Sequence, residues 1–163
     1  MKYAEGPTVE AEIEIAAPSA EVWRWVVDIE LPSRFSSEFL GADWADGWHG
    51  PELGAQFVGR SEHPRIGQWQ TTCTLVGYEP ERLFSWVVQN PESPAATWRF
   101  ELEPTDGGTK LKQWARLGPG PSFLLKIIET MPDKEDKIVA GRLTEHRNNM
   151  LATLEGIKKL AEG

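Results

Sequence analysis

The sequence has 163 residues, of which 40% are hydrophobic and 26% charged, and this fits one globular domain spanning residues 1–163. Its net charge of −8, from 25 acidic and 17 basic residues, argues against binding to nucleic acid or to an anionic membrane surface, because both need a basic face. No stretch reaches the roughly 18 apolar residues of a membrane span. No signal-peptide-like run opens the chain and its single cysteine cannot form an internal disulfide, so we expect a cytoplasmic protein.

Residues 8–16 read TVEAEIEIA, with apolar and acidic side chains in alternation. A period of two predicts a strand with one buried and one exposed face. Pro18 and Ser19 follow, and the apolar residues after them are spaced as in a short helix, for which Ser19 is the expected N-cap. A second short helical segment is expected over Pro32–Phe35.

Six further strands are expected between residues 39 and 118, where alternation recurs in separate segments. The segments are FLGADWADG, GAQFVGRSE, QWQTTCTLVGY, RLFSWVVQN, ATWRFELEP and TKLKQWARL. Separators such as HPRIG, EPE, NPESPA and TDGG are rich in the residues that hairpin turns require. Strands joined by hairpins run in opposite directions, so the pattern predicts an antiparallel meander.

A long helix is expected over Asp133–Glu162, after LGPGPS at residues 117–122 ends the sheet region. Its apolar residues recur with a helical period, on the stripe Val139, Leu143, His146, Met150, Leu154, Ile157 and Ala161. A strongly curved antiparallel sheet can wrap such a helix, and the helix does not fill the concave side completely. We therefore expect a cavity between the sheet and this helix.

The order of these elements resembles the START-like superfamily, also called the helix-grip or SRPBCC fold, and within it the polyketide cyclase/dehydrase-like proteins. The motifs that carry the resemblance are VEAEIEI with APSAEVWRWVVDIE, GAQFVGR before HPRIGQWQTTCTLVGYEPERLFSW, and RLGPGPS with TEHRNNMLATLEGIKKLAEG. The resemblance implies an α+β fold in which a curved seven-stranded antiparallel sheet wraps around a long C-terminal helix, with two short helices after the first strand. It also implies an internal, mostly apolar pocket. It does not imply one function, because the superfamily holds lipid carriers, hormone receptors, aromatases, hydrolase-like members and chaperone cofactors.

The segment HPRIGQWQTTC, residues 63–73, gathers several chemically distinctive side chains in a turn and the strand after it. If Gly67 closes the turn, Trp69, Thr71 and Cys73 share the face that is expected to point inward. A β-bulge in this strand would exchange the two faces, so the parity stays open. Nothing in the sequence places a base beside Cys73, and a small buried thiol is its expected role.

Other inward-facing positions complete the expected pocket. Gln113 is an amide among apolar neighbours, and a buried polar group needs a partner that a ligand or water can supply. His146 lies in the apolar stripe of the last helix, and Arg142, Asn149 and Thr153 continue the same edge at spacings of three and four. The expected ligand contacts are Phe35, Phe57, Gly59, Trp69, Thr71, Cys73, Trp86, Trp98, Gln113, His146 and Met150.

No complete catalytic motif is present, and His146, His63 and Arg60 are the candidates for acid–base chemistry. His63 precedes Pro64 in a turn, where a solvated loop histidine is expected. The alternative places His63 at the mouth of the pocket with Arg60 or Arg65. The three histidines lack the spacing of a metal site, and the glycine-rich segments lack the context of a phosphate-binding loop, so no metal and no cofactor is expected.

Three functions remain open. The first is binding of a hydrophobic small molecule, aromatic polyketide-like or lipid-like, in the cavity of a monomer or homodimer. The second is catalysis as a polyketide cyclase, aromatase or dehydratase, in which the cavity folds the substrate and His146 or His63 moves protons. The third is a protein-interaction module like the chaperone cofactors, which predicts an apolar patch on the outer sheet face, where Trp114 shares the parity of Lys110 and Lys112.

Overall fold

The computed structural model describes residues 1–163 and contains seven strands and three α-helices. The strands are β1 (Thr8–Ile15), β2 (Phe39–Trp44), β3 (Gln56–His63), β4 (Gly67–Glu79), β5 (Leu83–Val88), β6 (Ala96–Thr105) and β7 (Gly108–Leu117). The helices are α1 (Ser19–Val26), α2 (Phe123–Thr130) and α3 (Glu135–Glu162). Three 3-10 turns stand between or before them, namely η1 (Tyr3–Glu5), η2 (Leu31–Arg34) and η3 (Pro132–Lys134).

All seven strands belong to one antiparallel sheet in the order β1-β7-β6-β5-β4-β3-β2. From β2 to β7 each strand pairs with the next strand of the chain, which confirms the predicted meander. The first strand, β1, pairs with the last strand, β7, and so adds a seventh strand beside the meander.

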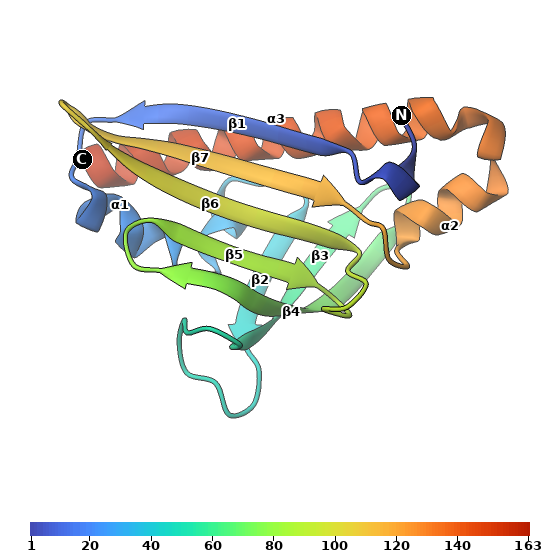
Figure 1. Ribbon diagram of the computed structural model, residues 1–163, viewed down its shortest axis with the longest axis horizontal. Helices are drawn as coiled ribbons and strands as arrows, with labels where there is room; N and C mark the ends of the chain where they lie inside the picture. Colours follow the sequence, from blue (N-terminus) through green and yellow to red (C-terminus); the bar gives the residue numbers. More distant parts are fainter.

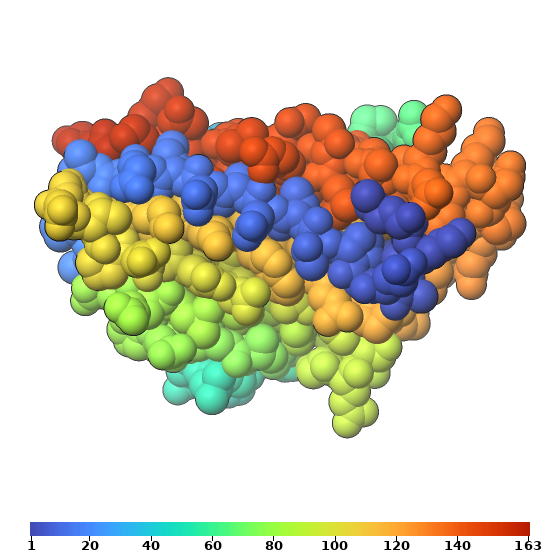
Figure 2. Space-filling view, turned by 45° about the horizontal axis from the view of Figure 1, so that its top comes forward, coloured from blue at the N-terminus to red at the C-terminus, as the bar shows by residue number.

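The sheet curves around α3, and this arrangement confirms the predicted helix-grip fold. In Figure 1, α3 runs along the whole length of the molecule beside β1, with α1 and α2 at opposite ends of the sheet. Figure 2 shows β1 in blue between α3 in red and orange and the yellow strands next to it. The concave face of the sheet and one face of α3 therefore enclose the interior.

The alternation in the sequence produces the two faces of the sheet. In β7, Leu111, Gln113 and Ala115 are buried, and the residues between them are partly exposed. Charged side chains occupy the outer face, where Lys112 forms an ion pair with Glu10 of β1. Because the inward set of every strand faces α3, the parity of each strand decides which side chains reach the interior.

The helix α3 buries the stripe that the sequence predicts, with Val139, His146, Met150, Leu154 and Ile157 all buried. On its other flank, α3 packs directly against the segment after α1. A Cβ atom at Gly156 would lie 2.4 Å from the ring of Phe35, the residue after η2, so the close approach of this ring requires glycine at that position. The helix therefore packs against the sheet, mainly β1, and against α1 and the Phe35 ring.

Two helix starts differ from the sequence predictions. Ser19 is the first residue of α1 and not its N-cap, because the extended residue before it is Pro18 and the Ser19 hydroxyl pairs with that of Thr109 at 3.2 Å. The long C-terminal helix starts at Glu135 and not at Asp133, since Pro132–Lys134 form the separate turn η3.

The sequence analysis does not predict α2, an eight-residue helix whose N-terminus is capped by Ser122. Its run FLLKIIET is short and largely apolar, and periodicity alone does not distinguish such a run from a buried strand. It is held by a second small core of Tyr3, Leu117, Ile128 and Val139. No helix, α2 included, combines the length and the apolar composition needed to cross a lipid bilayer.

Candidate functional site

A cavity of about 450 Å³ lies between the concave face of the sheet and α3. It is lined by 34 residues, 18 of them hydrophobic, from strands β2 to β7 and from all three α-helices. Cavities of roughly 300–1,000 Å³ with this mixture of apolar walls and few polar groups are typical of small-molecule sites. The sheet and α3 therefore leave a hollow interior large enough for a ligand.

Aromatic rings form one wall of the cavity, with Trp86 of β5 at its centre. The Trp86 and Trp98 rings are stacked with centroids 6.4 Å apart and planes 11° from parallel. Phe57 meets Trp86 edge-on at 5.9 Å, and Phe84 lies 5.5 Å from it. Offset and edge-on pairs are favourable geometries for aromatic rings, so these contacts hold the rings of the wall in a preformed apolar surface.

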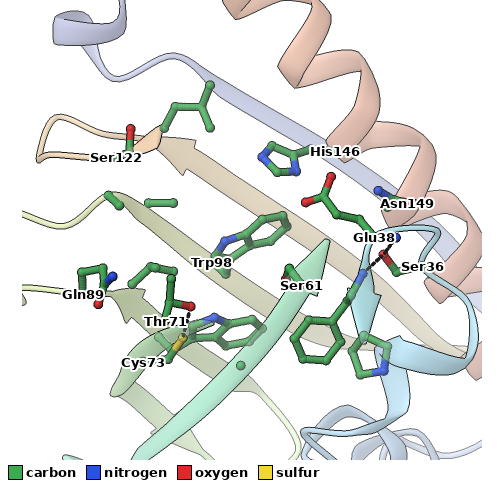
Figure 3. A pocket seen from close by; sticks show the side chains of 18 of the residues that line it. Ser36, Glu38, Ser61, Thr71, Cys73, Gln89, Trp98, Ser122, His146 and Asn149 are labelled. Carbon is green, nitrogen blue, oxygen red and sulfur yellow. Dashed lines mark hydrogen bonds between the residues drawn. The ribbon is translucent and has the colours of Figure 1, made fainter. Parts of the chain in front are cut away.

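The strand β4 contributes Trp69, Thr71 and Cys73 to the cavity lining, and Figure 3 shows Thr71 and Cys73 there. The register shift in β4 lies between Leu75 and Gly77, after this run, so the faces are not exchanged. Burial raises the pKa of Cys73 to about 12, although a hydrogen bond with Thr71 acts in the opposite direction. The thiol is therefore protonated, as expected for a wall group and not for a nucleophile.

His146 projects from α3 into the cavity, across from β6 (Figure 3). Its ring meets the Trp98 ring edge-on, with centroids 4.9 Å apart. Desolvation by burial and the nearby charge of Arg142 lower the pKa of His146 well below its ordinary value of 6.5. The imidazole is neutral at neutral pH, so it offers one N–H donor and one acceptor nitrogen.

Gln113 is the second polar group of the interior. The residue is only 6% exposed, and its amide oxygen is buried without a hydrogen-bond partner. Trp98 pairs with Ala115, so Gln113, two residues earlier on the same face of β7, is a diagonal neighbour of Trp98. An unpartnered buried acceptor costs roughly 1–3 kcal/mol, and a ligand that donates a hydrogen bond would recover this cost.

A chain of charged side chains joins α3 to the sheet at the cavity edge. Arg142 binds both oxygens of Glu38 at 2.6 and 2.7 Å, and these two side chains are only 12% and 15% exposed. Arg142 also donates to Glu145 at 3.3 Å. Burial opposes the charge on Arg142, but the hydrogen bonds and charges of Glu38 and Glu145 outweigh it and raise the Arg142 pKa. The guanidinium is therefore already neutralised by two carboxylates.

His63 belongs to this chain of contacts, and the prediction of a solvated loop histidine is wrong. It is the last residue of β3, and its side chain is 13% exposed. Its Nδ1 accepts from the backbone N–H of Arg65 at 3.1 Å, so Nε2 carries the proton and donates to Glu145 at 2.7 Å. The turn holds the His63 ring against α3. This contact cannot be predicted from the sequence around His63, because Glu145 is distant in the chain.

The alternative that groups Arg60 or Arg65 with His63 at the mouth of the pocket finds no support in the geometry. Arg60 forms an ion pair with Asp43 of the neighbouring strand at 2.5 Å. The residues that line the cavity do not include Arg60, Arg65 or His63. The candidates for chemistry therefore separate, with His146 inside and the other three side chains outside.

Among the expected ligand contacts, only Phe35 lies away from the cavity, because its ring packs on Gly156 of α3. The structure brings the other ten together around the cavity. They are Phe57, Gly59, Trp69, Thr71, Cys73, Trp86, Trp98, Gln113, His146 and Met150.

The sequence analysis does not identify the lining at the end of the cavity near α2. Phe123 of α2 is 45% exposed and meets the Trp69 ring at 5.9 Å. Leu124 and Lys126 of the same helix also line the cavity. The capping serine before α2, Ser122, is the one local signal that indicates this helix.

Elsewhere the ionisable residues do not gather into a further site. No three His, Cys, Asp or Glu side chains are arranged to hold a metal ion. The cavity can bury an apolar molecule, exchange hydrogen bonds with it at Gln113 and His146, and accept a proton at the His146 ring.

Comparison with known families and structures agrees with this geometry. Residues 6–144 match the family model described as "Polyketide cyclase / dehydrase and lipid transport". A search of the curated proteins found no match.

Several solved structures share the fold. A polyketide cyclase-like protein of Corynebacterium glutamicum is 28% identical, with a TM-score of 0.67 over 95% of this chain and 91% of that one. The di-domain ARO/CYC protein BexL from the BE-7585A biosynthetic pathway is 16% identical, with a TM-score of 0.72 over 98% of this chain and 51% of that one. The di-domain ARO/CYC protein StfQ from the steffimycin pathway is 14% identical, with a TM-score of 0.63 over 95% of this chain and 49% of that one. This chain thus spans about half of each di-domain protein.

Proposed function

Because the chain belongs to the polyketide cyclase/dehydrase and lipid transport family, we propose that it binds a hydrophobic aromatic molecule in the cavity between its sheet and α3. The observation that carries the proposal is the cavity itself, whose aromatic wall includes the stacked rings of Trp86 and Trp98. Most of the affinity would come from burial of apolar area, at about 25 cal/mol per Å². The hollow interior also favours ligand binding over the interaction-module alternative.

The outer face supports the same choice. Trp114, the aromatic residue on that face, is covered by Arg99, whose guanidinium carbon lies 4.1 Å from the centre of the ring. A covered ring among charged neighbours is a poor docking patch, because such a patch needs contiguous exposed apolar area.

Binding is tested with naphthalene and anthracene derivatives by titration calorimetry and thermal unfolding. A ligand present at 100 times its Kd should stabilise the protein by about 2.7 kcal/mol. Replacing Trp86 by alanine should weaken binding about tenfold, because a stacking surface of the wall is lost. The matched control is Trp114→Ala on the outer face, which should bind as the wild type does. Equal loss in both variants, or no binding of any probe, would overturn the proposal.

A second candidate function is catalysis as a cyclase or dehydratase, and the neutral His146 ring in the cavity supports it. In a dehydration, His146 would take a proton from the carbon next to a ketone, and its imidazolium would return the proton to the hydroxyl that leaves as water. His146→Gln should then abolish turnover of a β-hydroxyketone substrate, whereas an apolar probe without hydrogen-bonding groups should still bind. His63→Gln is the matched control, because His63 does not line the cavity and its replacement should preserve turnover.

A further inference from the structure

Around Trp98 the cavity offers hydrogen bonds but no unpaired cation, and the one lysine of the lining, Lys126, lies on α2. Of the cationic side chains around the cavity, Lys126 is exposed at the α2 end, and Arg142 is held by Glu38 and Glu145. A carboxylate entering the cavity would find Arg142 already paired and would face Glu38 beside it. Burying a carboxylate without a partner is strongly unfavourable, so the part of the cavity beside Trp98 disfavours an anionic group.

The deep polar groups instead match an uncharged hydroxyl. The Gln113 amide oxygen is buried and lacks a partner, so it can accept a hydrogen bond from a donor. His146 is 7% exposed, and its neutral ring presents both a donor and an acceptor. Both residues adjoin Trp98, because the His146 ring contacts the Trp98 ring and Gln113 is the diagonal neighbour of Trp98 in the sheet register. A hydroxyl can donate and accept at once, and it carries no charge to desolvate.

We propose that the cavity selects ligands that bear an uncharged phenol or enol hydroxyl, bound at Gln113 beside Trp98, and rejects their carboxylate analogues. This inference rests on the proposed function, because it specifies which hydrophobic molecules the cavity takes.

Four probes of one ring system test the selectivity, namely 2-naphthol, 2-methylnaphthalene, 2-methoxynaphthalene and 2-naphthoate. The methyl compound has nearly the shape of the naphthol without a polar atom, and the methoxy compound can accept but cannot donate. In Gln113→Met, the ratio of the Kd of 2-methylnaphthalene to that of 2-naphthol should fall roughly tenfold, because one hydrogen bond to a buried acceptor is lost. For the wild type, 2-naphthoate should bind at least about 100-fold more weakly than 2-naphthol.

The matched control is Val88→Ala, which trims an apolar wall residue and should weaken all neutral probes by a similar factor. His146→Gln provides a second test of the polar end that does not depend on the folding of the Gln113 variant. If no neutral probe binds the wild type, the proposed function fails. If 2-methylnaphthalene binds but the Kd ratio is the same in the wild type and in both polar variants, or 2-naphthoate binds as well as 2-naphthol, only the present inference fails.

Discussion

His146 should make the stability of the fold depend on pH, because burial and the charge of Arg142 hold the pKa of His146 well below 6.5. Below pH 6.5 the unfolded chain binds a proton at this residue while the folded chain does not. The free energy of unfolding should therefore fall with decreasing pH, by up to about 1.4 kcal/mol per pH unit from this residue. His146→Gln should remove that part of the slope. Urea unfolding between pH 5 and pH 8 measures it, and identical slopes in the two proteins would contradict the assignment.

Cys73 should be inert in the folded protein. Its thiol is 4% exposed and its pKa is raised to about 12, so thiolate is scarce at pH 8. We expect a disulfide reagent to react at least about 100-fold more slowly with the native protein than with the protein in urea. Because the chain has one cysteine, the absorbance of the thiolate that the reagent releases reports the reaction of Cys73 alone. Rapid labelling of the native protein would instead indicate an open route to the cavity wall.

At the residue scale, the sequence predicts the strand-borne part of the site well. Alternation alone places Trp69, Trp86, Trp98 and Gln113 on inward faces, because the parity of a strand is a local property. Local rules do not determine how Glu38 and Arg142 meet, since 104 residues separate them in the chain. Phe35 illustrates the same limit, because only the three-dimensional structure shows that its ring packs on Gly156 and not in the cavity.

At the scale of elements, the Glu38–Arg142 pair ties α3 to the segment that leads into β2. Removing one partner of a largely buried pair leaves the other charge uncompensated, so Arg142→Met should destabilise the fold by about 3 kcal/mol. The double variant Glu38→Leu with Arg142→Met should recover most of this loss, because the buried Glu38 charge is gone and Glu145, which is 45% exposed, keeps its contact with His63. Urea unfolding of the two single variants and the double variant measures the coupling. Additive effects would show that the pair does not act as a unit.

How well the sequence predicts an element depends on the length of that element. Seven strands and the 28-residue α3 carry long periodic patterns, and the meander follows from hairpin turns between neighbours. The eight-residue α2 has no such pattern, and its position depends on a distant partner, Tyr3, in the second small core. The end of the cavity that α2 lines could therefore not be predicted.

At the scale of the whole molecule, the cavity is needed for ligand binding but lowers the stability of the fold. A solid core would gain dispersion contacts and lose water-accessible apolar area, so an empty hollow lowers the stability of the fold. The curvature of the sheet and small residues of β3 in the cavity lining, such as Gly59 and Ser61, keep this space open. Filling it should stabilise the protein and remove its function together.

Ser61→Leu tests this competition, because Ser61 lines the cavity and pairs with Trp69 across β3 and β4. The larger side chain should enter the hollow, raise the free energy of unfolding by about 1 kcal/mol and raise Tm by roughly 2–4 °C. Calorimetric binding of 2-methylnaphthalene should be lost in the same variant. The neighbouring exposed Glu62 supplies the control, since Glu62→Gln faces outward and should change neither quantity. If Ser61→Leu binds the probe as tightly as the wild type does, the ligand does not occupy this cavity.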